Sequence, residues 1–312
     1  MQMIDLSRRQ LLAAAALSAL PPLQAARPKG YLVDFTHLFG DDRQRFPYHN
    51  YALNQAAPKP VETYSAWVRE AKIDHTVIIH SEVYQDDHGY LEYCFEKEPS
   101  PGYFKATCLF DPIDPKTPAR IEEMYRKYPT RIIGMRIHAQ NDAATPPTTS
   151  GGVRNRDLRD PGMKNTWRKL NELGLGVQMQ SIPYHTPEVR ALKEQFPDMP
   201  LQLDHFGQPA RGTEAEFKQV LGLAKLPRVY MRVEGVGGGA SANRWYADPS
   251  KLAHMVYDAF GPDHLIWEGY GGTMAAFEQR LAQIETLFGF ASEADRAKMR
   301  GLNAMKLFGF PT

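Results

Sequence analysis

The segments TVIIHSE (residues 76–82), IIGMRIHA (132–139) and LGVQMQSIP (175–183) decide the fold. Their apolar residues alternate with polar ones, as do those of YLVDFTHLF (31–39), LQLDHFG (201–207), VYMRVEG (229–235) and LIWEGYGG (265–272). A loop and a helical stretch follow most of these segments. Strand and helix repeated in this order predict a parallel α/β fold with its chemistry at the carboxyl ends of the strands.

Helical stretches with apolar residues at every third or fourth position separate the strand-like segments. We expect helices within residues 60–73, 119–128, 161–174, 186–196, 249–260 and 292–309. Two long polar loops, residues 40–60 and 140–162, and a glycine-rich one at 235–245 follow predicted strands. Long loops at this place are typical of binding sites, so we expect them to cover the barrel mouth.

Composition restricts the kinds of partner. The chain has 312 residues, 43% of them hydrophobic, and a formal net charge of +1. Because acids and bases are interspersed, neither nucleic acid nor an anionic membrane surface is an expected partner. Past the N-terminus, no apolar run approaches the roughly 20 residues of a membrane span. We therefore expect a small-molecule substrate, and a homo-oligomer stays open.

The first 26 residues have the order of a twin-arginine export signal. Arg8 and Arg9 precede the weakly apolar stretch AAAALSAL, and Ala25 and Ala26 offer a cleavage site. This predicts export to the periplasm by the twin-arginine route, with residues 27–312 as the mature domain. The two cysteines, Cys94 and Cys108, lack CxxC spacing, and we expect them to be buried free thiols rather than a disulfide.

From residue 31 to 310 the chain resembles the amidohydrolase-related (amidohydrolase 2) TIM-barrel hydrolases, which include sugar and pyrone lactonases. The matching stretches are THLF (36–39), GMRIHA (134–139), LDHFGQP (203–209), FGPDHLIW (260–267) and NAMKLFGF (303–310). The resemblance implies a single-domain α/β fold, the (β/α)8 TIM barrel, and a hydrolase with its site residues at the strand ends. It also implies metal ligands, namely a His-x-His pair on the first strand, a middle-strand histidine and a last-strand aspartate.

Three of these implied ligand positions hold residues that bind zinc poorly. They read Phe35, Gln180 and Tyr270 in this chain. Zinc sites use three or more nitrogen, sulfur or oxygen ligands, so we expect no tightly bound metal and no other cofactor. One divalent ion such as zinc is the alternative.

Four residues are predicted to be catalytic. His37 and His205 hold the histidine positions of the resemblance and would place or polarise the substrate. Glu234 and Glu268 depart from the family pattern, and either could be a general base if burial raised its pKa. The alternative for Glu268 is a buried counter-ion of an arginine.

Seven further residues are predicted to bind substrate. Arg136 would need either an anionic ligand or an internal acidic partner, because an unpaired charge inside a barrel is costly. Strand alternation places His205 on the face of Leu203 and directs Asp34 and Asp204 away from the lumen. The other six are His80, His138, Gln180, His185, Arg232 and Tyr270.

These residues favour a hydrolase that opens a small carbohydrate- or aromatic-derived lactone by base-assisted water attack. A lactone is reactive enough for a general base and an electrostatic clamp to suffice without tightly bound metal. Two alternatives stay open, a barrel that binds a small ligand without hydrolysis and a lyase or decarboxylase on the same scaffold.

Overall fold

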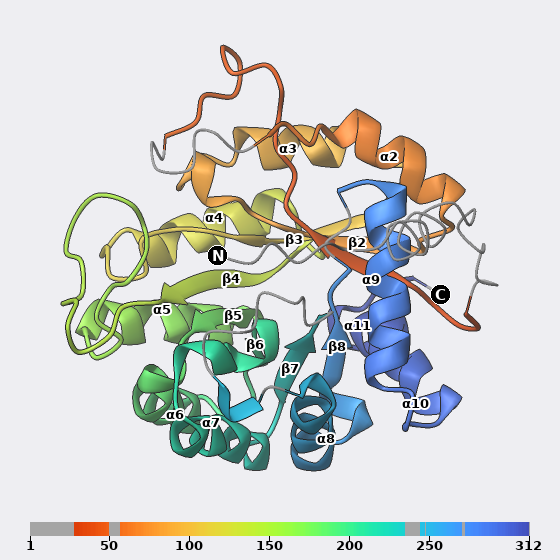
Figure 1. The fold of residues 1–312 in the computed structure, drawn as a ribbon. Coiled ribbons are helices and arrows are strands. Elements are labelled where there is room, and N and C mark those ends of the chain that lie inside the picture. Colours follow the sequence, from red (N-terminus) through yellow and green to blue (C-terminus); the bar gives the residue numbers. More distant parts are fainter. Residues whose placement is uncertain (1–27, 50–56, 235–243, 247, 270–271, 312) are drawn as a thin grey trace, which may run out of the picture.

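The computed structural model describes residues 28–49, 57–234, 244–246, 248–269 and 272–311. The predicted export signal, Tyr270 and most of the glycine-rich loop lie outside these residues. Figure 1 shows strands and helices alternating along the chain, with the strands gathered at the centre. The predicted (β/α)8 barrel is confirmed.

Eight parallel strands form one sheet in chain order, and β8 lies beside β1, so the sheet curls into a nearly closed barrel. The strands are β1 (Val33–Thr36), β2 (His75–Ile79), β3 (Phe104–Cys108), β4 (Ile132–Ala139), β5 (Gly176–Ser181), β6 (Leu201–Leu203), β7 (Val229–Val233) and β8 (Leu265–Trp267).

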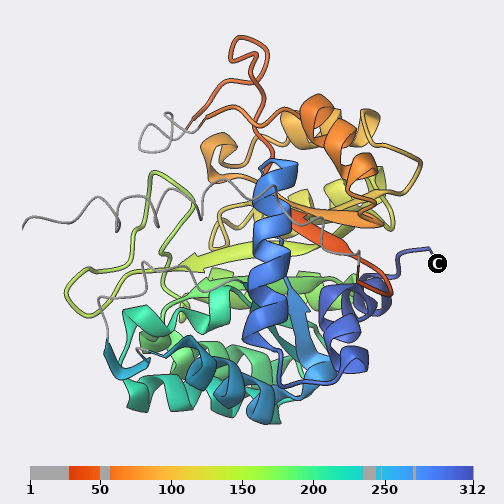
Figure 2. The ribbon, with the colours of Figure 1, turned by 45° about the vertical axis from the view of Figure 1, so that its right-hand side comes forward.

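Helices surround the strands, as the two views in Figures 1 and 2 show. They are α2 (Val61–Glu70), α3 (Gly89–Glu96), α4 (Thr117–Lys127), α5 (Pro161–Glu172), α6 (Thr186–Gln195), α7 (Glu214–Leu221), α8 (Pro249–Phe260), α9 (Met274–Leu287), α10 (Glu293–Ala297) and α11 (Asn303–Phe308). The six helical stretches expected from the sequence all contain helices. α3, α7 and α9 lie outside these six stretches, although Phe277, Leu281 and Ile284 give α9 a clear apolar spacing.

The part of the barrel interior away from the carboxyl ends of the strands is an apolar cluster, the floor of the barrel, and α11 covers it. Val33, Val77 and Ile266 pack there with Met305 and Phe308 of α11. Lys105 of β3 fixes this floor, because its Nζ donates to the carbonyl oxygens of Phe308 (2.6 Å) and Gly309 (3.0 Å). Such bonds satisfy carbonyls that a helix end leaves unpaired.

Between the strands and the outer helices lies the larger core, and Asp34 belongs to that side. Its Oδ2 accepts a hydrogen bond of 2.6 Å from the hydroxyl of Tyr64 in α2. The prediction that Asp34 points away from the lumen is confirmed. Cys94 and Cys108 are both free and buried, as expected.

The long loop after β4 is held by a buried arginine. Arg156 is 2% exposed and pairs with Asp111 through Nη2 and Oδ2 at 2.7 Å. It also donates to Thr148 and to the carbonyl oxygen of Ser150, so both limbs of the loop are fixed to one side chain.

In the described part of the chain, no helix is long and apolar enough to cross a membrane.

Candidate active site

His205 lies where the backbone turns sharply at the end of β6. The φ angles of His205, Phe206, Gly207 and Gln208 are 52°, 56°, 69° and 54°, a run in the left-handed region that side chains disfavour. Strain of this kind is kept where the surrounding structure enforces it, and it gathers at functional sites. The turn swings the His205 ring towards the carboxyl ends of β7 and β8.

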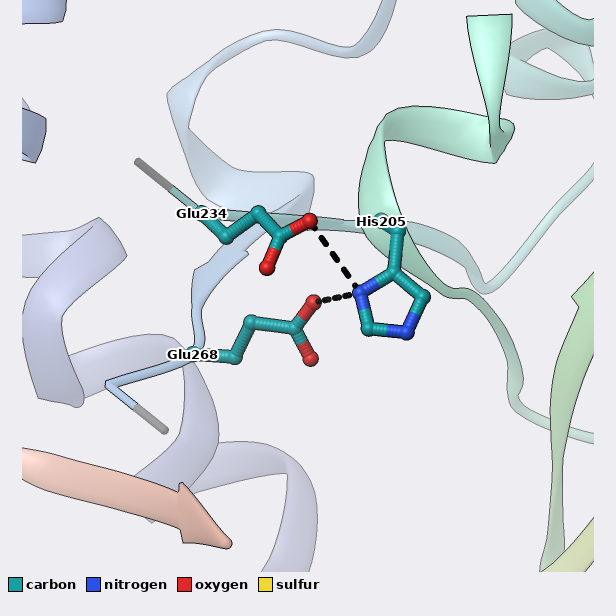
Figure 3. A group of neighbouring side chains, drawn as sticks. All are labelled: His205, Glu234 and Glu268. Atoms are coloured by element: carbon teal, nitrogen blue, oxygen red, sulfur yellow. Dashed lines mark ion pairs between the residues drawn. The ribbon is translucent and has the colours of Figure 1, made fainter. Parts of the chain in front are cut away.

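Two carboxylates meet the same nitrogen of His205 (Figure 3). Its Nδ1 lies 2.8 Å from Oε1 of Glu268 and 3.3 Å from Oε1 of Glu234. Because an ionised carboxylate can only accept hydrogen bonds, this contact favours the ring tautomer with its proton on Nδ1. In the neutral ring the lone pair is then on Nε2, which Figure 3 shows directed away from both acids.

Glu268 is fully buried beside an arginine. Both Glu268 and Arg232 are 0% exposed, and Arg232 Nη2 contacts Oε2 of Glu268 directly. Burial alone would raise the pKa of Glu268, but the positive charge of Arg232 and the contact with His205 outweigh burial and lower it to about 2. Glu268 is therefore an ionised counter-ion of Arg232, one of the two roles that the sequence left open.

Asp204 corrects the orientation expected from strand alternation. It points into the lumen, where its Oδ1 accepts from Arg232 Nη1 at 2.8 Å and its Oδ2 from Gln178 Nε2 at 3.0 Å. Leu203 packs in the outer core, on the face opposite to Asp204. His205 reaches the lumen as well only because the chain leaves the extended conformation after Asp204. Alternation is valid only within an extended strand, and that condition ends here.

Arg136 joins this network to the opposite side of the barrel. Its guanidinium lies 3.5 Å from Asp204, donates to Gln180 Oε1 and donates to Nε2 of His37 at 2.9 Å. His37 in turn donates from Nδ1 to the carbonyl oxygen of Ile79 at 2.9 Å. Burial first, and then the charge of Arg136, lower the pKa of His37 well below its usual value, so its ring is neutral.

His138 lies two residues further along β4 and is buried like Arg136. Its Nδ1 lies 3.6 Å from Oε1 of Glu82. Glu82 is paired with Arg154 from the long loop, through Nε and Oε1 at 2.8 Å. Burial, followed by the charge of Arg136, lowers the pKa of His138 well below its usual value.

Two predicted substrate-binding histidines lie outside this cluster. His80 donates a hydrogen bond from Nε2 to the carbonyl oxygen of Gln85 at 2.9 Å, and its ring stacks on His88 with ring centroids 4.2 Å apart. His185 is bonded through Nε2 to the carbonyl oxygen of Asn141 at 2.7 Å. Both rings join neighbouring loops, and the structure brings neither to His205. Tyr270 lies outside the described residues.

Lys59 is a residue at the mouth that the sequence gave no reason to choose. A bridge between Phe39 and Lys59 closes the first long loop and brings the Lys59 amine onto the hydroxyl of Thr36. Burial lowers the pKa of Lys59 to about 8, although Asp34 opposes the shift. The pairing partner of a loop residue is set by tertiary structure, so no local pattern could have identified it.

The donor set does not fit the zinc site that the resemblance implies. One ligand atom from each of His205, Glu234 and Glu268 lie within 4.8 Å of one another, which is close enough for one ion. Glu268, however, is already neutralised by Arg232, and Nδ1 of His205 faces the same carboxylate. Of the implied ligand positions, Phe35 presents its ring to Arg232 and Gln180 accepts from Arg136.

The fold and the polar cluster define the class: a (β/α)8 barrel with a histidine–carboxylate–arginine site at its mouth. The family model described as Amidohydrolase matches residues 30–310, and the chain belongs to that family. No curated protein sequence matches the chain.

Several solved structures share the fold at low sequence identity. A probable 2-pyrone-4,6-dicarboxylic acid hydrolase from Acinetobacter baumannii with citric acid bound is 15% identical, with a TM-score of 0.67 over 89% of this chain and 99% of that one. A zinc-bound amidohydrolase from Burkholderia multivorans is 17% identical, with a TM-score of 0.68 over 90% and 100%. A 2,6-dihydroxybenzoate decarboxylase from Rhizobium is 13% identical, with a TM-score of 0.57 over 90% and 99%.

Proposed function

We propose that this protein is a hydrolase that opens a small lactone or similar cyclic ester, with His205 as the general base. The observation that carries the proposal is the 2.8 Å contact between Nδ1 of His205 and the buried carboxylate of Glu268. A carboxylate on one ring nitrogen orients a histidine and leaves the other nitrogen to take a proton from water.

The base differs from the one expected from the sequence. A general base works best when its pKa is near the working pH. The lowered pKa of Glu268 makes it a poor base, and its two oxygens already contact Arg232 and His205. Glu268 is therefore proposed to hold His205 in place, while Glu234 supports the same nitrogen from 3.3 Å.

In the proposed reaction, Nε2 of His205 takes a proton from water while the water oxygen bonds to the lactone carbonyl carbon. The ring C–O bond then breaks, and the departing oxygen takes the proton back from His205, which yields a hydroxy acid. Arg136 is proposed to stabilise the negative oxygen or a substrate carboxylate, because a guanidinium matches both in charge and geometry. His37 and Gln180 hold that guanidinium at the mouth.

The solved structures with the same fold support a cyclic ester and also a second candidate reaction. A pyrone is a cyclic ester, and the hydrolase from Acinetobacter baumannii is named for one. The decarboxylase from Rhizobium has the same fold, so carbon–carbon cleavage of an aromatic acid is the alternative reaction. The two differ in product, because ring opening releases one acid proton and decarboxylation releases carbon dioxide.

A screen of sugar-derived and aromatic lactones, with acid release followed by a pH indicator and carbon dioxide by gas analysis, tests this proposal. We expect acid release from at least one lactone, and a loss of about 10²- to 10⁴-fold in kcat for His205→Gln. His185→Gln is the matched control, since it removes a buried ring that lies outside the cluster. The proposal fails if no lactone is opened, or if His205→Gln keeps the wild-type rate.

If no substrate turns over, a small-molecule screen by thermal shift separates a binding barrel from an enzyme. A ligand that raises the melting temperature of both wild type and His205→Gln without being converted would support the binding protein. That result would contradict the hydrolase.

We also propose periplasmic export by the twin-arginine route, on the sequence Ser7-Arg8-Arg9-Gln10-Leu11-Leu12. Changing Arg8 and Arg9 to Lys should retain the protein in the cytoplasmic fraction. A protein that reaches the periplasm unchanged after this substitution would contradict the proposal.

A further inference from the structure

Arg232 has the environment of a bound cation. Its guanidinium bridges Asp204 and Glu268, which are 1% and 0% exposed, and its Cζ lies 4.6 Å from the ring centroid of Phe35. Phe35 stands at the position of the first metal-binding histidine of the resemblance. An aromatic face attracts a guanidinium but gives a metal ion no lone pair.

We infer that the guanidinium of Arg232 replaces a divalent cation in this barrel. Three carboxylates, those of Asp204, Glu234 and Glu268, and the ring of His205 gather at the ends of β6, β7 and β8. Buried carboxylates need a compensating charge, and Arg232 supplies it from within the chain. This inference concerns charge at the site and does not depend on which reaction the site carries out.

The same guanidinium keeps a metal ion out. An ion bound to His205, Glu234 and Glu268 would share Glu268 with Arg232, and two like charges at such short range in a buried site repel strongly. It would also have to displace the proton on Nδ1 of His205. The cation site that the three ligand atoms could form is therefore closed by the arginine that pairs with Glu268.

Arg232 is in this view a positioning residue for His205. It keeps Glu268 ionised and fixes it through Oε2, and Glu268 then holds Nδ1 of His205 through Oε1. Removing the positive charge while keeping the bulk should release Glu268 for a metal ion. The variant Arg232→Met does this, since methionine is long, flexible and uncharged.

The test is titration of chelator-treated protein with MnCl2 and, separately, ZnCl2, followed by calorimetry and by melting temperature. We expect wild type to show no stoichiometric, His205-dependent binding. Arg232→Met should bind about one Mn2+ per chain at least about tenfold more tightly than wild type, with a raised melting temperature. Adding His205→Ala to Arg232→Met should abolish both effects.

Arg300→Met is a matched control. Arg300 is 1% exposed and also pairs with two glutamates, Glu285 and Glu293, but no histidine is part of that cluster. Its loss should create no comparable ion binding. The variant Arg232→Lys keeps the positive charge, so we expect it to bind no ion at this site either.

Two results would overturn the inference. One is wild-type protein that binds Mn2+ or Zn2+ stoichiometrically in a way that His205→Ala removes. The other is a folded Arg232→Met that binds no ion. If Arg232→Met does not fold, refolding it from urea decides the matter, because recovery of the fold only with Mn2+ supports the inference and no recovery with Mn2+ contradicts it.

Discussion

The lower and the upper halves of the barrel interior are lined by the same strands with opposite chemistry. On β8, Ile266 belongs to the apolar floor, and two residues later Glu268 belongs to the charged cluster. On β1, Val33 packs in the floor and His37 binds Arg136. The floor stabilises the fold by burying apolar surface. At the mouth, the attraction between buried charges offsets the free-energy cost of their desolvation only when all of them are paired.

The sharpest test of this difference is the loss of a lumen charge. Arg232→Ala leaves Asp204 and Glu268 buried without their main counter-charge and should cost about 3–5 kcal/mol in the free energy of unfolding. Arg300→Ala should cost only about 1 kcal/mol, because the side chains of its partners are 29% and 47% exposed and water can replace the arginine. Urea unfolding of both variants measures the two effects, and equal losses would mean that burial of the acids does not matter.

A floor substitution should act on stability alone. Phe308 packs edge-on against Phe35 with ring centroids 5.9 Å apart, and Phe308→Ala should lower the free energy of unfolding by about 3 kcal/mol. The rate per folded molecule should stay near that of wild type, since Phe308 packs among the apolar floor residues and not among the charged residues at the mouth. A large fall in kcat for the folded variant would show that floor and mouth are coupled.

A smaller effect is expected at the turn that presents His205. Gly207 has φ 69°, and a Cβ there would lie 2.7 Å from Cγ1 of Val220, so Gly207→Ala should cost about 1–3 kcal/mol and lower kcat. Gly174→Ala is the control, because Gly174 has φ 68° but nothing within 4 Å of the added Cβ. It should lose some stability and keep its kcat. If both variants keep kcat, the turn does not position His205.

The dependence of stability on pH should be the most gradual effect. His37 and His138 have lowered pKa values in the fold, so below pH about 6.5 the unfolded chain binds more protons and stability falls as the pH drops. Glu268 also has a lowered pKa, so its contribution is present above the usual value of about 4.3 and is lost as pH falls towards about 2. Urea midpoints between pH 8 and 3 should fall in these two stages. In the variant His138→Gln the first fall in the urea midpoint should be smaller. An unchanged first fall would contradict its assignment to His138.

Period-two alternation and polar strand ends predicted the repeated strand-and-helix fold. The resemblance to the amidohydrolase-related barrels added His37 and His205 as expected site residues, and alternation added Arg136 and Glu268. The face of Asp204 was predicted wrongly, because alternation assumes an extended backbone and the chain turns at His205. The sequence left open which arginine would pair with Glu268, and it did not predict that Asp204 pairs with Arg232. Alternation gives a face of a strand, but which side chains meet across the lumen depends on how the strands are arranged around it.

The position of α11 bears on how the molecule folds. Gly301, just before α11, lies so close to Tyr31 that an added Cβ would be 2.3 Å from the Tyr31 carbonyl oxygen, and Arg300 donates to the carbonyl of Lys29. The end of β1 at the barrel floor is therefore covered only by one of the last segments in the sequence. Contacts between such distant segments raise contact order and slow folding. During synthesis, the apolar end of β1 stays uncovered until α11 leaves the ribosome, and exposed apolar surface of this kind promotes aggregation.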